Sequence, residues 1–216
     1  MPEGLRGISL FENVGDEDLE ALEAIVVSRN YPKNAIIMTE GDHSDTILLI
    51  VSGRVKIYVS DENNKELVLD ILGPGQCFGE MVLDEGPRSA SVMTLEPCQM
   101  AMLTRASFRS YLADHPEVAI GLIRHLINRC RALTENAKDL ALMDVYGRLS
   151  KLLLSLAEEE EGRLVIREKL TKQAIGERIG ASREMVSRIF KDLTAGGYIR
   201  SEGNAWVIQR RPPANW

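Results

Sequence analysis

Apolar residues between Pro116 and Met143 recur at alternating intervals of four and three positions over about four heptads. The recurring positions are Ala119, Ile123, Leu126, Cys130, Leu133, Ala137 and Leu140. This spacing predicts a long helix with the a and d seam of a coiled coil, and isoleucine at a followed by leucine at d favours two parallel strands. We therefore expect the same helix of a second copy to be the partner.

The alternative is one long amphipathic helix that packs on its own domain. Ile120 and Ile127 fall at e positions beside the seam. They supply a second apolar edge, which we expect to cover the chain's own domain while the a and d residues meet the partner.

From Ala35 to Leu103 the apolar period changes to two, which predicts β-strands. The expected strands are Ala35–Met38, Thr46–Val51, Val55–Val59, Leu67–Ile71, Ser91–Thr94 and Gln99–Leu103. Gly, Pro, Asn and Asp residues separate them as turns. Short strands at this spacing favour a sandwich, barrel or roll, and an amphipathic helix at Gly15–Val26 is expected to act as its lid.

Beyond the long helix, Asp144 is the expected N-cap of a helix that ends near Leu156. The acidic run Glu158–Glu161 follows, and we expect it to be a solvated loop. A short strand at Leu164–Ile166 completes this segment.

The next segment has the pattern of a helix-turn-helix. Thr171 and Ser182 are expected to cap two helices that are separated by a turn at Gly180. The second helix, Arg183–Leu193, has an apolar face formed by Met185, Val186, Ile189 and Phe190. Its opposite face carries Arg183, Glu184, Ser187, Arg188 and Lys191. A β-hairpin wing around Gly203-Asn204 is expected to follow.

Charge is unevenly distributed along the chain, which has 216 residues and a net charge of -6. From Arg163 to the end there are eleven Lys and Arg residues and five Asp and Glu residues, giving +6. The preceding residues have fifteen against twenty-seven, giving -12. An acidic body with a basic terminal domain is typical of a protein that places one end on a polyanion.

Several function classes lack support in the sequence. The three cysteines, Cys77, Cys98 and Cys130, have no zinc or dithiol spacing, so we expect reduced, buried thiols and no metal. No stretch resembles a secretion signal or a membrane span, which predicts a cytoplasmic chain with no membrane partner. No Ser-His-Asp, metal or P-loop spacing occurs, and we therefore expect that the protein is not an enzyme.

One stretch of the β region has the composition of an anion site. Phe78-Gly79-Glu80-Met81 is followed, after a short acidic link, by Gly86-Pro87-Arg88-Ser89-Ala90. A glycine that opens a helical turn exposes backbone N–H groups to phosphate oxygens, Arg88 supplies a bidentate charge and Ser89 a neutral donor. Glu80 can accept from a sugar hydroxyl, so a sugar phosphate is one interpretation. The other is that Arg88 is a turn arginine paired with Glu80, Asp84 or Glu85.

Taken with two later motifs, these residues give a chain that resembles the cyclic-AMP receptor protein and fumarate-nitrate regulator family of bacterial transcription factors over nearly its whole length. The later motifs are Leu142–Arg148, reading LMDVYGR, and Ser182–Arg188, reading SREMVSR. The resemblance implies an α+β fold with an effector-binding β-roll at residues 1–115. It further implies a central dimerisation helix at 116–143 and a winged helix-turn-helix DNA-binding domain at 144–216.

The resemblance implies that Arg183, Glu184 and Arg188 read double-stranded DNA at a half-site similar to TGTGA. Arginine pairs with guanine O6 and N7, and glutamate accepts from cytosine N4. Phosphate contacts are implied for Thr171, Gln173 and Ser182, and Lys191 is expected to make another. A homodimer would present two such helices about 34 to 36 Å apart and require a palindromic operator. RNA polymerase is a further implied partner.

For the effector, the resemblance implies that Gly79 and Glu80 hold a ribose, with Met81 in the same cassette. Arg88 and Ser89 would hold a cyclic phosphate, and Thr134 a purine across the dimer axis. Two features depart from the family. The segment between Glu80 and Arg88 is shorter than usual, and Leu133 stands where cyclic-AMP binders have a threonine, so purine selectivity is expected to be altered.

Cyclic AMP is the first choice of effector, and cyclic di-GMP or no ligand is the second. A cyclic-nucleotide-binding regulatory subunit without specific DNA binding is the alternative of another class. For the regulator, we expect the effector to shift an equilibrium between two arrangements of the basic domains, with Asp144 and its neighbours as the hinge.

Overall fold

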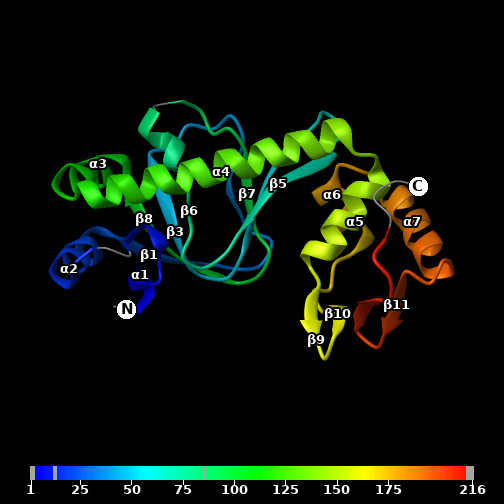
Figure 1. Ribbon diagram of the computed structural model, residues 1–216. Helices are drawn as coiled ribbons and strands as arrows, with labels where there is room; N and C mark the ends of the chain where they lie inside the picture. The colour runs from blue at the N-terminus through cyan, green and yellow to red at the C-terminus, as the bar shows by residue number, and fades with distance from the viewer. Residues whose placement is uncertain (1–2, 12–13, 85, 213–216) are drawn as a thin grey trace. The chain divides into compact units, whose positions relative to one another are not determined.

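The computed structural model describes residues 3–11, 14–84 and 86–212, and the chain forms two compact units (Figure 1). One comprises Met1–Val59 with Leu69–Ala132, and the other comprises Ser60–Val68 with Leu133–Trp216. Helices and antiparallel strands occur in both, so the α+β class expected from the sequence is confirmed.

Two four-stranded sheets form the β-roll. The first has the order β1 (Val27–Tyr31), β8 (Cys98–Thr104), β3 (Thr46–Ser52) and β6 (Cys77–Phe78). The second has the order β2 (Ile36–Met38), β7 (Ser91–Thr94), β4 (Val55–Ser60) and β5 (Glu66–Leu72). The expected strands are therefore present, together with β1 and β6, which the alternation of apolar residues did not indicate.

Strand β3 is buried on both faces. Ile47 and Leu49 belong to the apolar core under the helices, whereas Leu48 and Ile50 belong to the core enclosed by the two sheets. Successive side chains of a strand point to opposite faces, so a strand between two cores is apolar at every position. This explains the uninterrupted apolar run in the sequence of β3.

Short helices cover the first sheet. They are α1 (Glu3–Arg6), the 3-10 turn η1 (Ser9–Phe11), α2 (Asp16–Ile25) and α3 (Arg105–Asp114). The lid expected at Gly15–Val26 is thus confirmed as α2, with Leu19 and Leu22 buried. Helix α3 was not expected from the sequence, although Thr104 caps it by accepting from the Ser107 backbone N–H at 3.1 Å.

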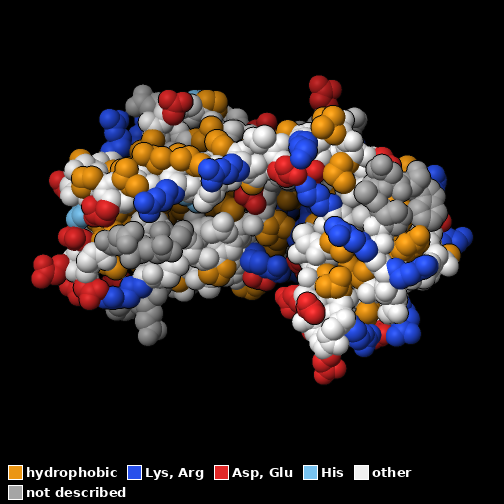
Figure 2. Space-filling view, viewed as in Figure 1, with side chains coloured by type: hydrophobic (Ala, Val, Ile, Leu, Met, Phe, Trp, Pro, Cys, Tyr) orange, Lys and Arg blue, Asp and Glu red, His pale blue; other side chains and the backbone are white. Residues whose placement is uncertain are grey.

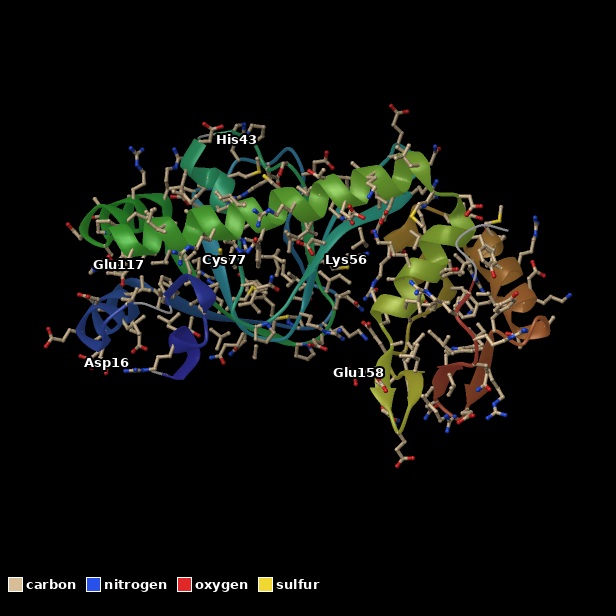
Figure 3. The ribbon with its side chains drawn as sticks, viewed as in Figure 1. Asp16, His43, Lys56, Cys77, Glu117 and Glu158 are labelled. Atoms are coloured by element: carbon tan, nitrogen blue, oxygen red, sulfur yellow. The ribbon has the colours of Figure 1, made fainter. Side chains whose placement is uncertain are left out.

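Helix α4 (Pro116–Leu142) is the longest helix among the described residues. Figure 3 labels Glu117 at its N-terminal end and Asp16 at the start of α2, where a negative charge suits the helix dipole. Gly121 lies where a Cβ would be 2.9 Å from the Leu10 carbonyl oxygen, so the helix can approach this segment closely only with glycine there.

The expected role of Ile120 and Ile127 in covering the β-roll is wrong. Val118 and Leu122 are buried against the first core, whereas Ile120 and Ile127 are 50% and 45% exposed. The reason is helical geometry, because positions two and nine residues after Val118 lie about 200° and 180° around the helix from it. Leu126, assigned to the seam, is partly buried against the same core.

The second unit contains a three-helix core beside a small sheet. The helices are α5 (Val145–Ser155), α6 (Lys172–Ile179) and α7 (Arg183–Ala195). The sheet has the order β11 (Ile199–Glu202), β12 (Ala205–Ile208), β10 (Arg163–Ile166) and β9 (Glu158–Glu160). The hairpin around Gly203-Asn204 is confirmed.

The loop expected at Glu158–Glu161 is wrong, although the run is largely exposed to solvent as expected. Residues Glu158–Glu160 form strand β9, which pairs with β10, and the chain reverses at Glu161 and Gly162, whose φ angles are 50° and 77°. The Arg167 guanidinium donates to both carboxylate oxygens of Glu160, at 2.6 and 2.5 Å. This neutralisation of one glutamate lowers the repulsion that would otherwise disfavour the strand.

The part of the chain that the structure describes contains no helix with the length and apolar character needed to cross a bilayer.

Candidate functional site

A pocket of about 320 Å³, open mouth included, lies in the β-roll next to β6, the 3-10 turn η2 (Glu80–Asp84) and β7. Its walls combine apolar side chains with a few polar ones. The lining residues are Met38, Ile57, Phe78, Gly79, Glu80, Met81, Arg88, Ser89, Ala90, Val92 and Arg129. The structure therefore brings together the expected residues Gly79, Glu80, Met81, Arg88 and Ser89.

Arg88 is a buried cation that lines this pocket, with 6% of its surface exposed. Its Nη1 donates to the Gly79 carbonyl at 2.8 Å and its Nη2 to the Thr46 carbonyl at 2.5 Å. Its Nε is buried and has no hydrogen-bond partner among the described residues. Burial lowers the pKa of Arg88 from its ordinary value, but a guanidinium keeps its charge at neutral pH.

The expected alternative, a turn ion pair of Arg88, is wrong for the carboxylates that the structure describes. Neither Glu80 nor Asp84 forms an ion pair with Arg88, and Glu85 lies outside the described residues. Both carbonyls that Arg88 contacts are neutral, so no carboxylate of the described residues touches the guanidinium, although the charges of Glu80 and Asp45 favour it from nearby. A buried cation in this state favours an anionic ligand.

Gly79 has a φ of 83°, in the left-handed region. A Cβ there would lie 2.8 Å from the Met38 methyl carbon and 3.1 Å from Arg88 Nη1. Only glycine allows the carbonyl of this residue to meet the guanidinium in this conformation. The glycine of the cassette is therefore needed to position Arg88 as well as to open the turn.

Glu80 is buried too, at 6% exposure, and it pairs with an arginine that the sequence reasoning missed. Arg129 of helix α4 donates through Nη1 to Glu80 Oε1 at 2.9 Å, while Glu80 Oε2 is buried without a partner among the described residues. Arg129 follows Val118 and Leu122 by eleven and seven positions, which places it on the buried side of the helix. A charged residue in that stripe was the available signal of a buried partner.

Ser89 and Met81 form a contact at the mouth of the pocket. The Ser89 hydroxyl donates to Met81 Sδ at 2.9 Å, and the Met81 side chain is 50% exposed. Leu133 and Thr134 belong to the other unit and do not line this pocket. Both are exposed on helix α4.

The cysteines differ from the expectation in one case. Cys77 and Cys98 are buried, and burial raises the pKa of Cys77 to about 12, so its thiol stays protonated. Cys130 is exposed on α4.

His125 lies beside Cys77 and Glu80, where burial lowers its pKa. Its Nε2 is buried without a hydrogen-bond partner among the described residues.

The helix-turn-helix is confirmed in its local detail. Thr171 accepts from the Ala174 N–H at 3.0 Å and Ser182 from the Met185 N–H at 3.2 Å, so both predicted N-caps are present. Gly180 has a φ of 65° and ends α6 in the left-handed conformation. The apolar faces of α6 and α7 meet in one core with α5.

The polar face of α7 is exposed to solvent. Arg183, Glu184, Ser187, Arg188 and Lys191 are all exposed. Among the described residues, no side-chain ion pair or hydrogen bond holds Arg183, Glu184 or Arg188. Met185, assigned to the apolar face, is 37% exposed, which corrects that assignment because it lies about 90° from the centre of the buried stripe. Gln173 donates to Glu177 at 3.0 Å.

A half-buried lysine lies beneath this face. Lys172 Nζ is 2.7 Å from the ring centre of Phe190 and 4.9 Å from that of Trp206, and burial lowers its pKa to about 8.

We expect the unfolding free energy to rise by about 1 kcal/mol between pH 7.5 and 9.5. Over this range Lys172 loses its proton in the folded protein, whereas in the unfolded chain it keeps the ordinary lysine pKa of 10.5 and stays protonated. The aromatic rings favour the cation and keep the effect small. Urea unfolding at the two pH values should show the rise, and Lys172→Met should remove it; an equal rise in both would contradict this assignment.

The segment between α4 and α5 is tied to the helix-turn-helix by one arginine. Asp144 caps α5 by accepting from the Gly147 N–H at 2.7 Å, as expected. Arg148 Nη1 donates to the Met143 carbonyl at 2.7 Å and its Nε to the Ile179 carbonyl at 2.8 Å. A change in backbone direction at Met143 would therefore be felt at the end of α6.

Comparison with known families matches both halves of the chain. Residues 28–115 match the family described as "Cyclic nucleotide-binding domain", and residues 147–213 match "Crp-like helix-turn-helix domain".

Individual relatives extend this match over nearly the whole chain. The chain is 35% identical over 213 residues to the CRP-like cAMP-activated global transcriptional regulator of Mycobacterium tuberculosis, covering 96% of this chain and 95% of the relative. It is 32% identical to the cAMP-activated global transcriptional regulator Vfr of Pseudomonas aeruginosa, covering 88% and 92%. The solved c-di-GMP responsive regulator CLP of Xanthomonas campestris superposes with a TM-score of 0.80 at 27% identity, covering 90% and 99%.

Proposed function

Because the chain belongs to the family of Crp-like transcription regulators that carry a cyclic nucleotide-binding domain, we propose that it is a homodimer whose affinity for a palindromic operator is set by a cyclic nucleotide, cyclic AMP being the first choice. The observation that carries the proposal is the pair of buried, incompletely satisfied charges in one pocket, Arg88 and Glu80. The wider proposal is a cytoplasmic regulator, not an enzyme, that acts together with RNA polymerase.

The polar atoms of the pocket match the parts of a cyclic nucleotide. The unpartnered Nε of Arg88 and the Ser89 hydroxyl are donors suited to a cyclic phosphate. The unpartnered Oε2 of Glu80 is an acceptor suited to a ribose hydroxyl, and Arg129 holds this carboxylate in place through Oε1. Thr134 and Leu133 of a second subunit are proposed to meet the purine.

Cyclic di-GMP is the second candidate. Two observations favour it: leucine at position 133 cannot hydrogen-bond an adenine, and the structurally similar regulator CLP is described as c-di-GMP responsive. Cyclic AMP stays the first choice because the Mycobacterium tuberculosis and Pseudomonas aeruginosa relatives are both described as cAMP-activated. Calorimetry with cyclic AMP, cyclic GMP and cyclic di-GMP decides between them.

The dimer is proposed to form along the exposed apolar side of α4, which Figure 2 shows as hydrophobic side chains between lysines and arginines. Ile120, Ile123, Ile127, Leu133 and Leu140 are between 41% and 51% exposed there. Apolar side chains exposed along one helix are costly to leave in water, and a second copy of the helix would cover them.

We expect Cys130 to form a disulfide with Cys130 of the second subunit across the proposed dimer interface. In a parallel pair it occupies an a position, where the same residue of each helix faces its counterpart across the axis at a distance that suits a disulfide. Mild oxidation should therefore produce a covalent dimer, visible on a non-reducing gel. Cys130→Ser should abolish the cross-link without changing the dimer mass in light scattering, whereas Ile123→Glu should give monomers. A monomer at micromolar concentration in the unmodified protein would refute the dimer.

On the DNA side, Arg183, Glu184 and Arg188 are exposed and have no side-chain partner among the described residues, and they are proposed to read a TGTGA-like half-site. Thr171, Gln173, Ser182 and Lys191 are proposed to contact phosphates. The rival class, a regulatory subunit without specific DNA binding, leaves this set of side chains without a role. A gel-shift assay with and without cyclic AMP separates them: equal binding to a TGTGA palindrome and a scrambled duplex would favour the rival.

For regulation, the effector is proposed to favour one of two arrangements of the basic domains. Full switching requires a preference of about 5.5 kcal/mol, and a charge-assisted contact of Arg88 made in one state alone supplies a large part of it. The proposed hinge is Asp144 and its neighbours, where Arg148 links the Met143 and Ile179 carbonyls.

A further inference from the structure

Met81 places an oxidisable sulfur at the mouth of the effector pocket. Its side chain is 50% exposed, and its Sδ accepts a hydrogen bond from the Ser89 hydroxyl at 2.9 Å. Arg88 lines the same pocket. The thioether therefore engages a donor that an effector phosphate is proposed to use.

We propose that Met81 is an oxidation site through which peroxides control effector binding, an inference that rests on the effector site proposed above. The sulfur attacks one oxygen of hydrogen peroxide, and an S–O bond forms as the O–O bond breaks. The second oxygen leaves with both protons as water. Sulfur loses the two electrons that the peroxide gains, and the product is methionine sulfoxide.

Oxidation changes the competition for Ser89. A thioether sulfur is a weak acceptor, so a phosphate displaces it from the hydroxyl with little loss. A sulfoxide oxygen is polar and accepts strongly, and it would lie at the mouth of the pocket that also holds the Arg88 cation. The sulfoxide oxygen would accept the hydrogen bond of the Ser89 hydroxyl and so compete with the effector phosphate for this donor. Loss of one charge-assisted hydrogen bond corresponds to a fall in effector affinity of about tenfold or more.

Among the described methionines, Met81 and Met185 are the exposed ones, whereas Met93, Met102 and Met143 are partly buried. Met38, which also lines the pocket, and Met100 are buried at 8% and 0% exposure, so peroxide reaches them slowly. Met185 is 37% exposed on α7, in the other unit, which makes it a matched control for oxidation away from the pocket. Cys130 is the exposed thiol among the described cysteines, so the test is performed with Cys130→Ser throughout.

The experiment treats this protein and its Met81→Leu and Met185→Leu versions with hydrogen peroxide. Peptide mass spectrometry follows oxygen addition, and calorimetry measures cyclic AMP affinity before and after treatment. The readout is the ratio of oxidised to reduced affinity within each variant. We expect Met81 to be oxidised before Met38. Oxidation should lower the cyclic AMP affinity about tenfold or more in the protein that keeps Met81 and in its Met185→Leu version. In the Met81→Leu version, oxidation should leave the affinity unchanged. Methionine sulfoxide reductase should restore the affinity.

Three results would overturn the proposal in recognisably different ways. Unchanged affinity after full conversion of Met81 would show that the sulfoxide does not obstruct the pocket. An equal fall with Met81→Leu would place the damage elsewhere. If the reduced protein bound no cyclic nucleotide, the effector proposal itself would fail and the control by oxidation with it.

Discussion

Replacing Arg88 with leucine is expected to lower cyclic nucleotide affinity at least about a hundredfold. The guanidinium is buried, has no carboxylate in direct contact among the described residues, and keeps its Nε unpartnered. A bidentate, charge-assisted contact to a phosphate is worth about 3 kcal/mol or more, and leucine retains neither the charge nor the donors. Calorimetry measures the affinity directly.

This variant needs a control for folding, because Arg88 also satisfies the Gly79 and Thr46 carbonyls. Each carbonyl loses the hydrogen bond from Arg88, although the Gly79 carbonyl still accepts from the Val82 N–H at 3.1 Å, so a lower melting temperature is expected as well. Arg88→Lys keeps the charge but not the planar fork, and it should retain part of the affinity. Binding to nonspecific DNA at low salt should stay unchanged, which shows that the DNA-binding unit is intact. A folded Arg88→Leu protein with full affinity would place the effector elsewhere.

The second large effect is expected from Arg183→Ala on operator recognition. One lost contact to guanine costs about 1 to 3 kcal/mol, and a symmetric dimer loses it at both half-sites, giving about 2 to 6 kcal/mol in total. The loss should be confined to one base pair of each half-site, where the variant should no longer distinguish the bases. Affinities for palindromes that carry each symmetric base change in turn would measure this.

Lys191→Ala is the matched control on the same helix face. If Lys191 contacts a phosphate, its removal should weaken binding to all of these duplexes alike and reduce the salt dependence of binding, because fewer counterions are released. The two variants should thus separate base reading from phosphate contact. An equal loss on every duplex with Arg183→Ala would show that this arginine is not a base-reading residue.

The sequence alone determined those features that depend on residues a few positions apart. The caps at Asp144, Thr171 and Ser182 each join a side chain to a backbone N–H three residues later, and Gly180 has the positive φ that the turn requires. Hydrogen bonds of such short range form wherever the local sequence permits them. The period of apolar residues likewise predicted the long helix and the strands of the β-roll except β1 and β6.

Only the tertiary structure decided which distant groups meet. Arg129 is 49 positions from Glu80, and Arg88 is 42 positions from the Thr46 carbonyl that it contacts. The sequence also predicted the wrong side of α4 to cover the β-roll: Ile120 and Ile127 were expected there, but Val118 and Leu122 are the buried residues. The two sides are both apolar and differ only by a rotation about the helix axis. Local spacing says that a helix has an apolar face, but the packing partner selects which face is buried, and that partner is fixed only when the whole chain has folded.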